Sequence, residues 1–288
     1  MQGLFVGLMT LDCIYQAQRP PQANEKLVAQ AAMMVAGGPA TNAAVAFAAL
    51  GGQATVMASV GQHPVTALLR EDMAHGGVSL TDLTPARTDP PPVSSIVVSQ
   101  AGERAVISRN AVGLQVEPRS IDALSHNLSH IDVVLLDGHQ MALSRQIASM
   151  AKNLDIPVVV DAGSWKPEFD QVLSLATVVI ASANFQPPDN SDALLYLQSL
   201  GIPYVAITQG EAPIVVSDRG QVRELAVPAT DVVDTLGAGD IFHGAFCHGW
   251  AGDFLAALTQ ASQVASLSCG YFGTRAWIAH CDSLTISK

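Results

Sequence analysis

The stretch Val232-Val233-Asp234-Thr235-Leu236-Gly237-Ala238-Gly239-Asp240-Ile241-Phe242 is the most informative part of this chain. Its glycines stand just before an apolar helical pattern, so backbone N–H groups at the start of a helix are free to bind an anion. Small residues there let a phosphate approach the backbone closely. Asp240 follows inside this anion site, where its carboxylate can take a proton from a hydroxyl that attacks the phosphoryl group.

A simpler interpretation of the same run is an Asp in the first turn of a helix, favoured by the helix dipole after a glycine-rich turn. The run matches neither of the two commoner phosphate-binding patterns. It lacks the Lys of G-x-x-x-x-G-K-[ST], and the third glycine of G-x-G-x-x-G falls on Phe242. The short run alone therefore leaves both interpretations open.

A second motif stands far upstream, Gly37-Gly38-Pro39-Ala40-Thr41-Asn42-Ala43-Ala44. Together and in this order, the two motifs resemble the signatures of the PfkB/ribokinase family of small-molecule kinases, and the likeness extends over most of the chain. The branch that it resembles most is ketohexokinase-like or sulfofructose-kinase-like, on Val233-Asp234-Thr235 and on the Gly270 to Ile278 segment. The resemblance implies an α/β fold, the ribokinase-like three-layer α/β/α arrangement with a mainly parallel central sheet and a small β lid.

The resemblance also implies roles for individual residues. Asp240 is the expected catalytic base, and Gly237, Ala238 and Gly239 form the expected anion hole. The residues expected to bind the sugar are Asp12, Gly37, Gly38, Asn42, Arg104 and Asn110. Those expected to contact the nucleotide are Asn184, Thr208, Gly210, Ala265 and Gly273. The implied cofactors are ATP and Mg²⁺, with K⁺ as a further option, and no residue is assigned as a direct metal ligand.

For several of these residues the local alternative stays open. Asp12 can serve as a turn-capping Asp, and Asn42 can cap a helix. An Asn amide also gives and accepts hydrogen bonds, which suits a vicinal diol. Arg104 can be a solvated charge of a hairpin.

The sequence departs from the family at one motif. Many members carry N-x-x-E, whose Glu positions Mg²⁺ and phosphate through water, whereas this chain has Asn184-Phe185-Gln186-Pro187. Asp189 is an acid that can substitute, although Pro187-Pro188 precedes it. Because some ketohexokinase-like members also lack the Glu, the departure does not exclude kinase activity.

Composition narrows the class of protein. A net charge of −11 over 288 residues argues against nucleic acid or an anionic membrane surface as a partner. The four cysteines are scattered without a C-x-x-C or zinc spacing, and we expect reduced thiols in a cytoplasmic protein. The stretch from Leu27 to Leu69 contains no Asp, Glu, Lys or Arg, but glycines and polar residues break it into pieces too short to cross a membrane.

Along the chain, apolar runs alternate with helical patterns in βαβ order, which predicts a mainly parallel sheet. The predicted elements include a strand over Leu4 to Leu8 that Asp12 follows, a helix over 121–129, a strand over Val133 to Leu136 and a helix over Phe254 to Cys269. Asp137, His139 and Asp161 follow two of these strands and are expected near a ligand cleft, or as helix caps. Val93 to Ser99 and Arg104 to Ser108 read as a hairpin. We expect one domain over 1–288 with a lid formed by about 13–35 and 90–110, through which the resemblance allows a homodimer.

The leading hypothesis is ATP-dependent phosphorylation of a hydroxyl of a small sugar, a ketohexose or related monosaccharide. A nucleoside kinase of the same fold is the first alternative. An ADP-dependent or phosphosugar-dependent relative is the second, and the latter requires more cations near the sugar than the sequence places there. The third is a non-catalytic ligand-binding member, supported by the missing acid of N-x-x-E.

Overall fold

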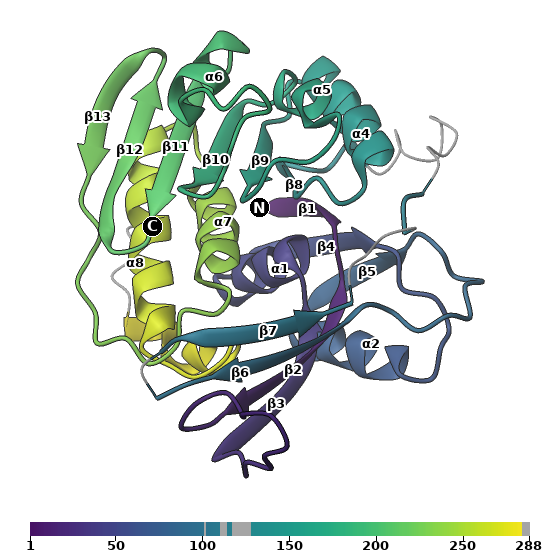
Figure 1. Cartoon of the computed structure of the whole chain (residues 1–288). Coiled ribbons are helices and arrows are strands. Elements are labelled where there is room, and N and C mark those ends of the chain that lie inside the picture. Colours follow the sequence, from purple (N-terminus) through teal and green to yellow (C-terminus); the bar gives the residue numbers. More distant parts are fainter. Residues whose placement is uncertain (101, 110–113, 117–127, 284–288) are drawn as a thin grey trace.

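The computed structural model in Figure 1 describes residues 1–100, 102–109, 114–116 and 128–283. Asn110 and most of the helix expected over 121–129 lie outside these residues. Among the described residues, no helix combines the length and the apolar character needed to cross a membrane.

The main sheet has nine strands in the order β13-β12-β11-β10-β9-β8-β1-β4-β5. Seven of them are parallel, as the βαβ order predicts: β1 Gln2–Gly7, β4 Gln53–Ala58, β5 Val78–Asp82, β8 Val133–Leu136, β9 Val158–Ala162, β10 Val178–Ser182 and β11 Tyr204–Gln209. An antiparallel edge follows, formed by β12 Ala212–Asp218 and β13 Gln221–Leu225. The carboxyl ends of the parallel strands share one edge of the sheet, where ligands of such folds gather.

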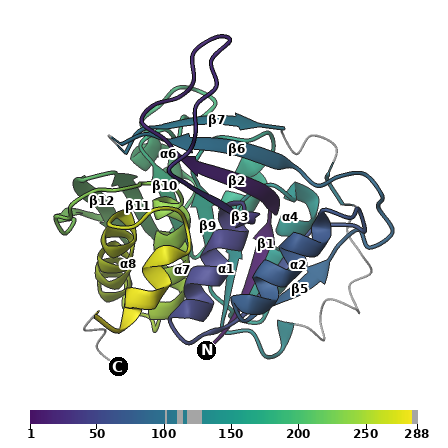
Figure 2. The ribbon, with the colours of Figure 1, turned by 90° about the horizontal axis from the view of Figure 1, so that it is seen from below.

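Helices cover both faces of this sheet and bury two separate apolar clusters. One face carries α1 Pro39–Ala49, α2 Thr66–His75, α7 Ala238–Gly249 and α8 Phe254–Cys269, followed by the 3₁₀ helix η1 Ala276–Ser283. The other carries α4 Met141–Asn153, α5 Phe169–Leu173 and α6 Ala193–Ser199. Figure 2 shows α8, α7, α1 and α2 side by side. The result is the expected three-layer α/β/α arrangement.

A second sheet of four strands, in the order β3-β2-β6-β7, forms what we call the lid. Its strands are β2 Thr10–Gln16, β3 Ala31–Gly37, β6 Val93–Val98 and β7 Arg104–Ser108, and β6 and β7 make the expected hairpin. The lid starts earlier than the expected residue 13, so Asp12 belongs to a strand and not to a turn after β1. Buried Ile14, Val35 and Ile96 give the lid its own small core, against which Leu236 and Phe272 pack.

The close approach of α1 and α7 sets the geometry of the site. A Cβ at Gly244, in the middle of α7, would lie 2.2 Å from the backbone oxygen of Ala43 in α1. Only a residue without a side chain permits two helices to approach so closely. This contact brings the first turns of α1 and α7, which carry the two glycine motifs, to the same place.

Candidate active site

The two glycine motifs lie side by side at the first turns of α1 and α7. Asn42 Nδ2 donates a hydrogen bond of 2.8 Å to Asp240 Oδ2, although the two residues are 198 positions apart. A Cβ at Gly237 would lie 3.7 Å from the same Asn42 nitrogen. The side chain of Asn42 therefore does not cap its own helix, and Asp240 faces the expected sugar-binding residues.

The loop before α7 has the shape expected of an anion site. Gly237 precedes the helix with φ 72°, a left-handed conformation that favours glycine. A Cβ at Gly239 would meet nothing within 4 Å, so this face of the loop is open. Asp234 anchors the loop, because its Oδ1 accepts from Leu236 N and its Oδ2 accepts from Gly273 N, each at 2.8 Å. The N–H groups in the first turn of a helix lack intrahelical partners and point out of it, and here the N–H of Ala238 donates to Thr235 O at 3.3 Å.

Asp240 has the electrostatics of a general base. Its burial, together with the nearby charge of Asp161, raises the pKa of Asp240 to about 7, while the hydrogen bond from Asn42 and the neighbouring His243 act in the opposite direction. A base works best when its pKa is close to the operating pH. Burial among other carboxylates thus gives this acid the proton affinity that the reaction needs.

Asp12 lies directly over the glycine pair. A Cβ at Gly37 would sit 1.9 Å from Asp12 Oδ2, so only glycine leaves room for this carboxylate. Thr10 Oγ1 donates to Asp12 Oδ1 at 2.7 Å, and burial raises the pKa of Asp12. Gly38 adopts φ 100°, and a Cβ there would lie 2.4 Å from Leu8 O. Asp12, Gly37, Gly38 and Asn42 thus form one polar corner beside Asp240.

Asp137, at the carboxyl end of β8, supports this corner from below. Its Oδ2 accepts from Leu8 N at 2.9 Å and from Ala40 N at 3.2 Å, which makes it the cap of α1 supplied from a distant strand. Burial opposes ionisation, but the charge of His139 and the N–H donors lower the pKa of Asp137 to about 2. Asp137 therefore holds the Gly38 turn in place as a permanent anion.

The residues expected to contact the nucleotide are divided between two places. Asn184 follows the carboxyl end of β10, Thr208 lies at the carboxyl end of the neighbouring β11, and Gly210 turns the chain between β11 and β12 with φ 65°. Asn184 is exposed. Ala265 lies on α8, partly buried against the core, and Gly273 lies in the loop after α8.

Arg104 reaches the beginning of the anion loop. Its Nη1 donates to Thr235 Oγ1 at 3.0 Å, from β7 of the lid. A Cβ at Gly102, at the tip of the same hairpin, would be 3.5 Å from Val232. The lid hairpin therefore touches the Asp234–Leu236 segment. Asp12, in the polar corner, belongs to β2, which is two strands away from β7 in the lid sheet.

Sequence reasoning missed three residues that shape the site: Asp234, His243 and Arg275. His243 lies one turn after Asp240, with Nδ1 2.7 Å from Gly239 O and Nε2 3.8 Å from Asp161 Oδ1. Arg275 bonds to Asn42. The signals available in the sequence were an Arg in an otherwise uncharged C-terminal stretch and an acid six positions before the base.

The side chains present fit a magnesium ion that takes most of its ligands from phosphates and water. Among the described residues, no group of three His, Cys, Asp or Glu side chains could hold a metal by itself. Asp189 is exposed and accepts from the backbone and hydroxyl of Ser191, in a local turn. Asp161 and Asn184 stand at the ends of adjacent strands and offer one carboxylate and one amide oxygen, a donor set typical of Mg²⁺ bound with a nucleotide.

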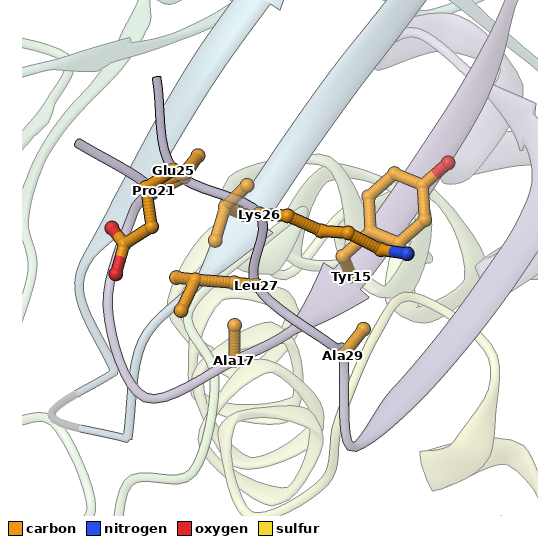
Figure 3. Close-up of a pocket in the computed structure, with 8 residues that line it drawn as sticks. Tyr15, Ala17, Pro21, Glu25, Lys26, Leu27 and Ala29 are labelled. Carbon is orange, nitrogen blue, oxygen red and sulfur yellow. The ribbon is translucent and has the colours of Figure 1, made fainter. Parts of the chain in front are cut away.

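A separate hollow of about 330 Å³ lies in the lid, between β2, β6 and the 17–30 loop. Figure 3 shows its lining, with Tyr15, Lys26 and Leu27 around the opening. None of the candidate site residues lines it, so the candidate site is the polar corner at α1 and α7.

A partly buried carboxylate at the open start of a helix, facing a polar corner on a parallel α/β sheet, is typical of a phosphotransferase that acts on a hydroxyl. A family model described as "pfkB family carbohydrate kinase" matches residues 3–280. The chain belongs to this family, and it is a sugar kinase.

Individual relatives agree with this assignment. An ATP-dependent ribose-1-phosphate kinase of Halopiger xanaduensis is 27% identical over 94% of this chain and 93% of its own. The ribokinase of Bacillus subtilis is 28% identical over the same shares. The solved structure of Arabidopsis thaliana ribokinase complexed with ribose and ATP superposes with a TM-score of 0.75 at 21% identity, over 94% of this chain and 93% of that one. At this identity the structural likeness supports the fold.

Proposed function

We propose that this protein transfers the γ-phosphoryl group of ATP to a hydroxyl of a free monosaccharide, a ketohexose or a related sugar. The observation that carries the proposal is the pairing of Asp240 with Asn42, which joins the base of one motif to the sugar-binding residue of the other. A sugar kinase needs the residues that recognise a polyol beside the residue that removes a proton, and this hydrogen bond holds Asn42 and Asp240 next to each other.

In this proposal the polar corner binds and orients the sugar. Asp12 accepts hydrogen bonds from sugar hydroxyls, and its burial beside Gly37 keeps water from competing for it. Asn42 Nδ2 retains a second N–H for the hydroxyl that is to react. Asp240 then takes the proton of that hydroxyl as the oxygen attacks phosphorus.

The phosphoryl group lies at the start of α7. Backbone N–H groups of Gly237, Ala238 and Gly239 stabilise the charge that develops on its oxygens, since they are fixed before the reaction begins. ATP occupies the edge beside Asn184, Thr208 and Gly210, and Mg²⁺ bound there supplies charge neutralisation of the phosphates. Asp161 and Asn184 would hold that ion. The lid closes over the sugar and excludes water, so that ATP is not wasted by hydrolysis.

The charges of the site favour a free sugar over a phosphosugar. The cation at the polar corner is Arg275, and its guanidinium already donates to Asn42, Asp72 and Ala36. Carboxylates of Asp12, Asp161 and Asp240 surround the space where the substrate would lie. The phosphate group of a phosphosugar bound there would face three carboxylates and a guanidinium whose donors are already in use.

Two further features of the family are proposed for this chain, a K⁺ site and a homodimer. Asp234 and the Gly273 loop, held together by a hydrogen bond of 2.8 Å, are where a K⁺ ion would stabilise the anion loop. A homodimer through the lid would cover side chains that the lid exposes, including Val28 (83% exposed), Met34 (60%) and Ile107 (80%).

The test is a substrate panel with the purified protein and one variant. Ketohexoses, ribose, ribose 1-phosphate and adenosine are offered with Mg-ATP, and ADP formation is measured. Asp240→Asn should fold and bind the sugar, but turn over at least about a hundredfold more slowly, because the base is missing. Turnover of only the nucleoside, or wild-type turnover by Asp240→Asn, would refute the proposal.

A further inference from the structure

Arg275 connects the two ends of the chain at the candidate site. It lies in the loop after α8, and its Nη1 donates to Asn42 Oδ1 at 3.0 Å across 233 positions of sequence. Its Nη2 donates to the backbone oxygen of Ala36, next to the glycine pair, and to Asp72 Oδ2 at 3.1 Å. The Asp72 carboxylate in turn accepts from Ala36 N at 3.0 Å. One guanidinium thus binds the strand that enters the Gly37-Gly38 turn and the helix that leaves it.

The bond to Arg275 fixes which way the Asn42 amide points. An Asn side chain has a donor end and an acceptor end of nearly equal shape, so its partners decide its orientation. Here Arg275, which can only donate, takes the oxygen, and the nitrogen is left to donate to Asp240. The reverse orientation would place Asn42 Oδ1 against the Asp240 carboxylate and the Asn42 NH₂ group against a guanidinium, so both contacts would be repulsive.

The same loop holds the anion site as well. Gly273, two residues before Arg275, donates its N–H to Asp234, whose other oxygen anchors Leu236. Thr274 lies between them and touches Gly237, since a Cβ on that glycine would lie 2.7 Å from Thr274 Cγ2. Residues 273–275 therefore contact the phosphate side and the sugar side of the site together.

From this arrangement we propose that Arg275 is a positioning residue for phosphoryl transfer: it locks the Asn42 amide so that one N–H meets Asp240 and the other meets the sugar hydroxyl. Arg275 acts through Asn42 and does not touch the reacting atoms. The part of this inference that concerns the sugar rests on the proposed function. The part that concerns Asp240 does not.

The groups that face Asp240 come from four elements. Asp161 of β9 and Asp12 of β2 raise its proton affinity, while Asn42 of α1 and His243 of α7 lower it. Arg275 itself acts on Asp12 by charge and on Asp240 through Asn42. Loss of Arg275 frees Asn42 to leave Asp240, which should raise the pKa of that carboxyl by about 0.5 to 1 unit, the worth of one hydrogen bond.

The first experiment needs no substrate. The Asp240 carboxyl is titrated by ¹³C NMR, with its signal assigned by its loss in Asp240→Asn. In Arg275→Gln the titration should move to higher pH than in the wild type. In Asp72→Asn, which removes the carboxylate that Arg275 binds but leaves the Asn42 bond, the titration should stay near the wild-type value, although both variants unfold at lower temperature. Equal shifts in the two variants, or none in Arg275→Gln, would overturn the proposal.

The second experiment uses the sugar that the panel identifies. Arg275→Gln should raise KM for the sugar at least about tenfold while KM for ATP changes less than about twofold. Arg275→Lys keeps the charge but cannot bind Asn42 and Asp72 together. Its KM for the sugar should therefore lie between those of the wild type and Arg275→Gln. In an Asn42→Ala background, Arg275→Gln should add nothing, because the group that it positions is gone. Additive effects in this cycle would contradict a role through Asn42.

The two proposals fail in different ways. A wild-type protein that phosphorylates no sugar sinks the proposed function, but leaves the carboxyl titration in place as the test of Arg275. An active wild type with an unchanged titration in Arg275→Gln sinks only the role of Arg275.

Discussion

Replacing Gly37 by Ala should remove the function of Asp12 without disturbing the fold. The new Cβ would lie 1.9 Å from Asp12 Oδ2 and 2.3 Å from its Cγ. Gly37 is not among the residues with positive φ, so its backbone accepts an L side chain. The atoms that must give way are the end of a side chain, which can rotate, and not the backbone.

The size of the effect follows from the distances. Ordinary van der Waals contact with a Cβ begins at 3.4 Å, so the carboxylate must move by about 1.5 Å. Such a movement also breaks the 2.7 Å bond from Thr10 Oγ1. Misplacing a group at a reacting centre by about 1 Å can cost about a hundredfold. We therefore expect kcat/KM for the sugar to fall by about a hundredfold or more.

The assay separates binding of the sugar from binding of the nucleotide. In Gly37→Ala, KM for the sugar should rise and KM for ATP should change little, since Asn184, Thr208 and Gly210 lie at the ends of β10 and β11, away from the Gly37 turn in sequence and sheet. Gly76→Ala is a matched control, because a Cβ there has 3.4 Å of clearance and φ is −74°. Wild-type kinetics for Gly37→Ala, or an equal loss in Gly76→Ala, would refute the placement of Asp12 in the sugar site.

Two predictions concern stability. Because burial raises the pKa of Asp240 from 3.8 to about 7, the unfolded state ionises first and the fold loses stability as pH rises from about 4 to about 7. Thermal unfolding from pH 4 to 8 should show Asp240→Asn gaining on the wild type over this interval and no further above it. The sugar kcat/KM should fall as pH drops below about 7, where the base becomes protonated. A pH-independent difference would contradict this. Gly244→Ala should lower the free energy of unfolding by about 1 to 3 kcal/mol in urea titrations, since its Cβ would lie 2.2 Å from the backbone of α1. Gly249→Ala is the control and should lower it less, because its Cβ meets the flexible end of Gln260 at 2.9 Å. A larger loss in Gly249→Ala would show that α1 and α7 can separate.

The sequence predicts most of the elements because their apolar patterns are strong and local. The helix expected over Phe254 to Cys269 and the strand over Val133 to Leu136 have the observed bounds. Asp12 was expected after a strand and lies within one, because β2 is defined by its partners β3 and β6 and not by its own pattern. The strand β5, Val78–Asp82, was not expected, since three of its five residues are polar and its pairing with β4 makes it a strand.

The site residues also divide into those that a local motif reveals and those that only tertiary packing reveals. Motif residues such as Asn42 and Asp240 can be found in the sequence because their neighbours are characteristic. Their contact follows from the packing of α1 on α7, which no local pattern reports. For Arg275 the sequence offers only its isolated charge in an otherwise uncharged stretch, because its partners lie 203 to 239 positions away and its own surroundings indicate a loop.

Two buried aspartates show how the fold gives one residue type two tasks. Asp137 accepts from the N–H groups of Leu8, Ala40 and His139, and these donors with the His139 charge hold its pKa near 2. Asp240 is buried less deeply, its hydrogen bond in the described structure comes from Asn42 alone, and its burial together with the charges of Asp161 and Asp12 raises its pKa to about 7. Burial alone does not decide the outcome, since it opposes ionisation in both. The neighbouring charges and donors do: an acid beside the His139 charge that also accepts from three N–H groups serves as a fixed anion under α1, and an acid beside other carboxylates with one amide donor retains the affinity for a proton that a base must have.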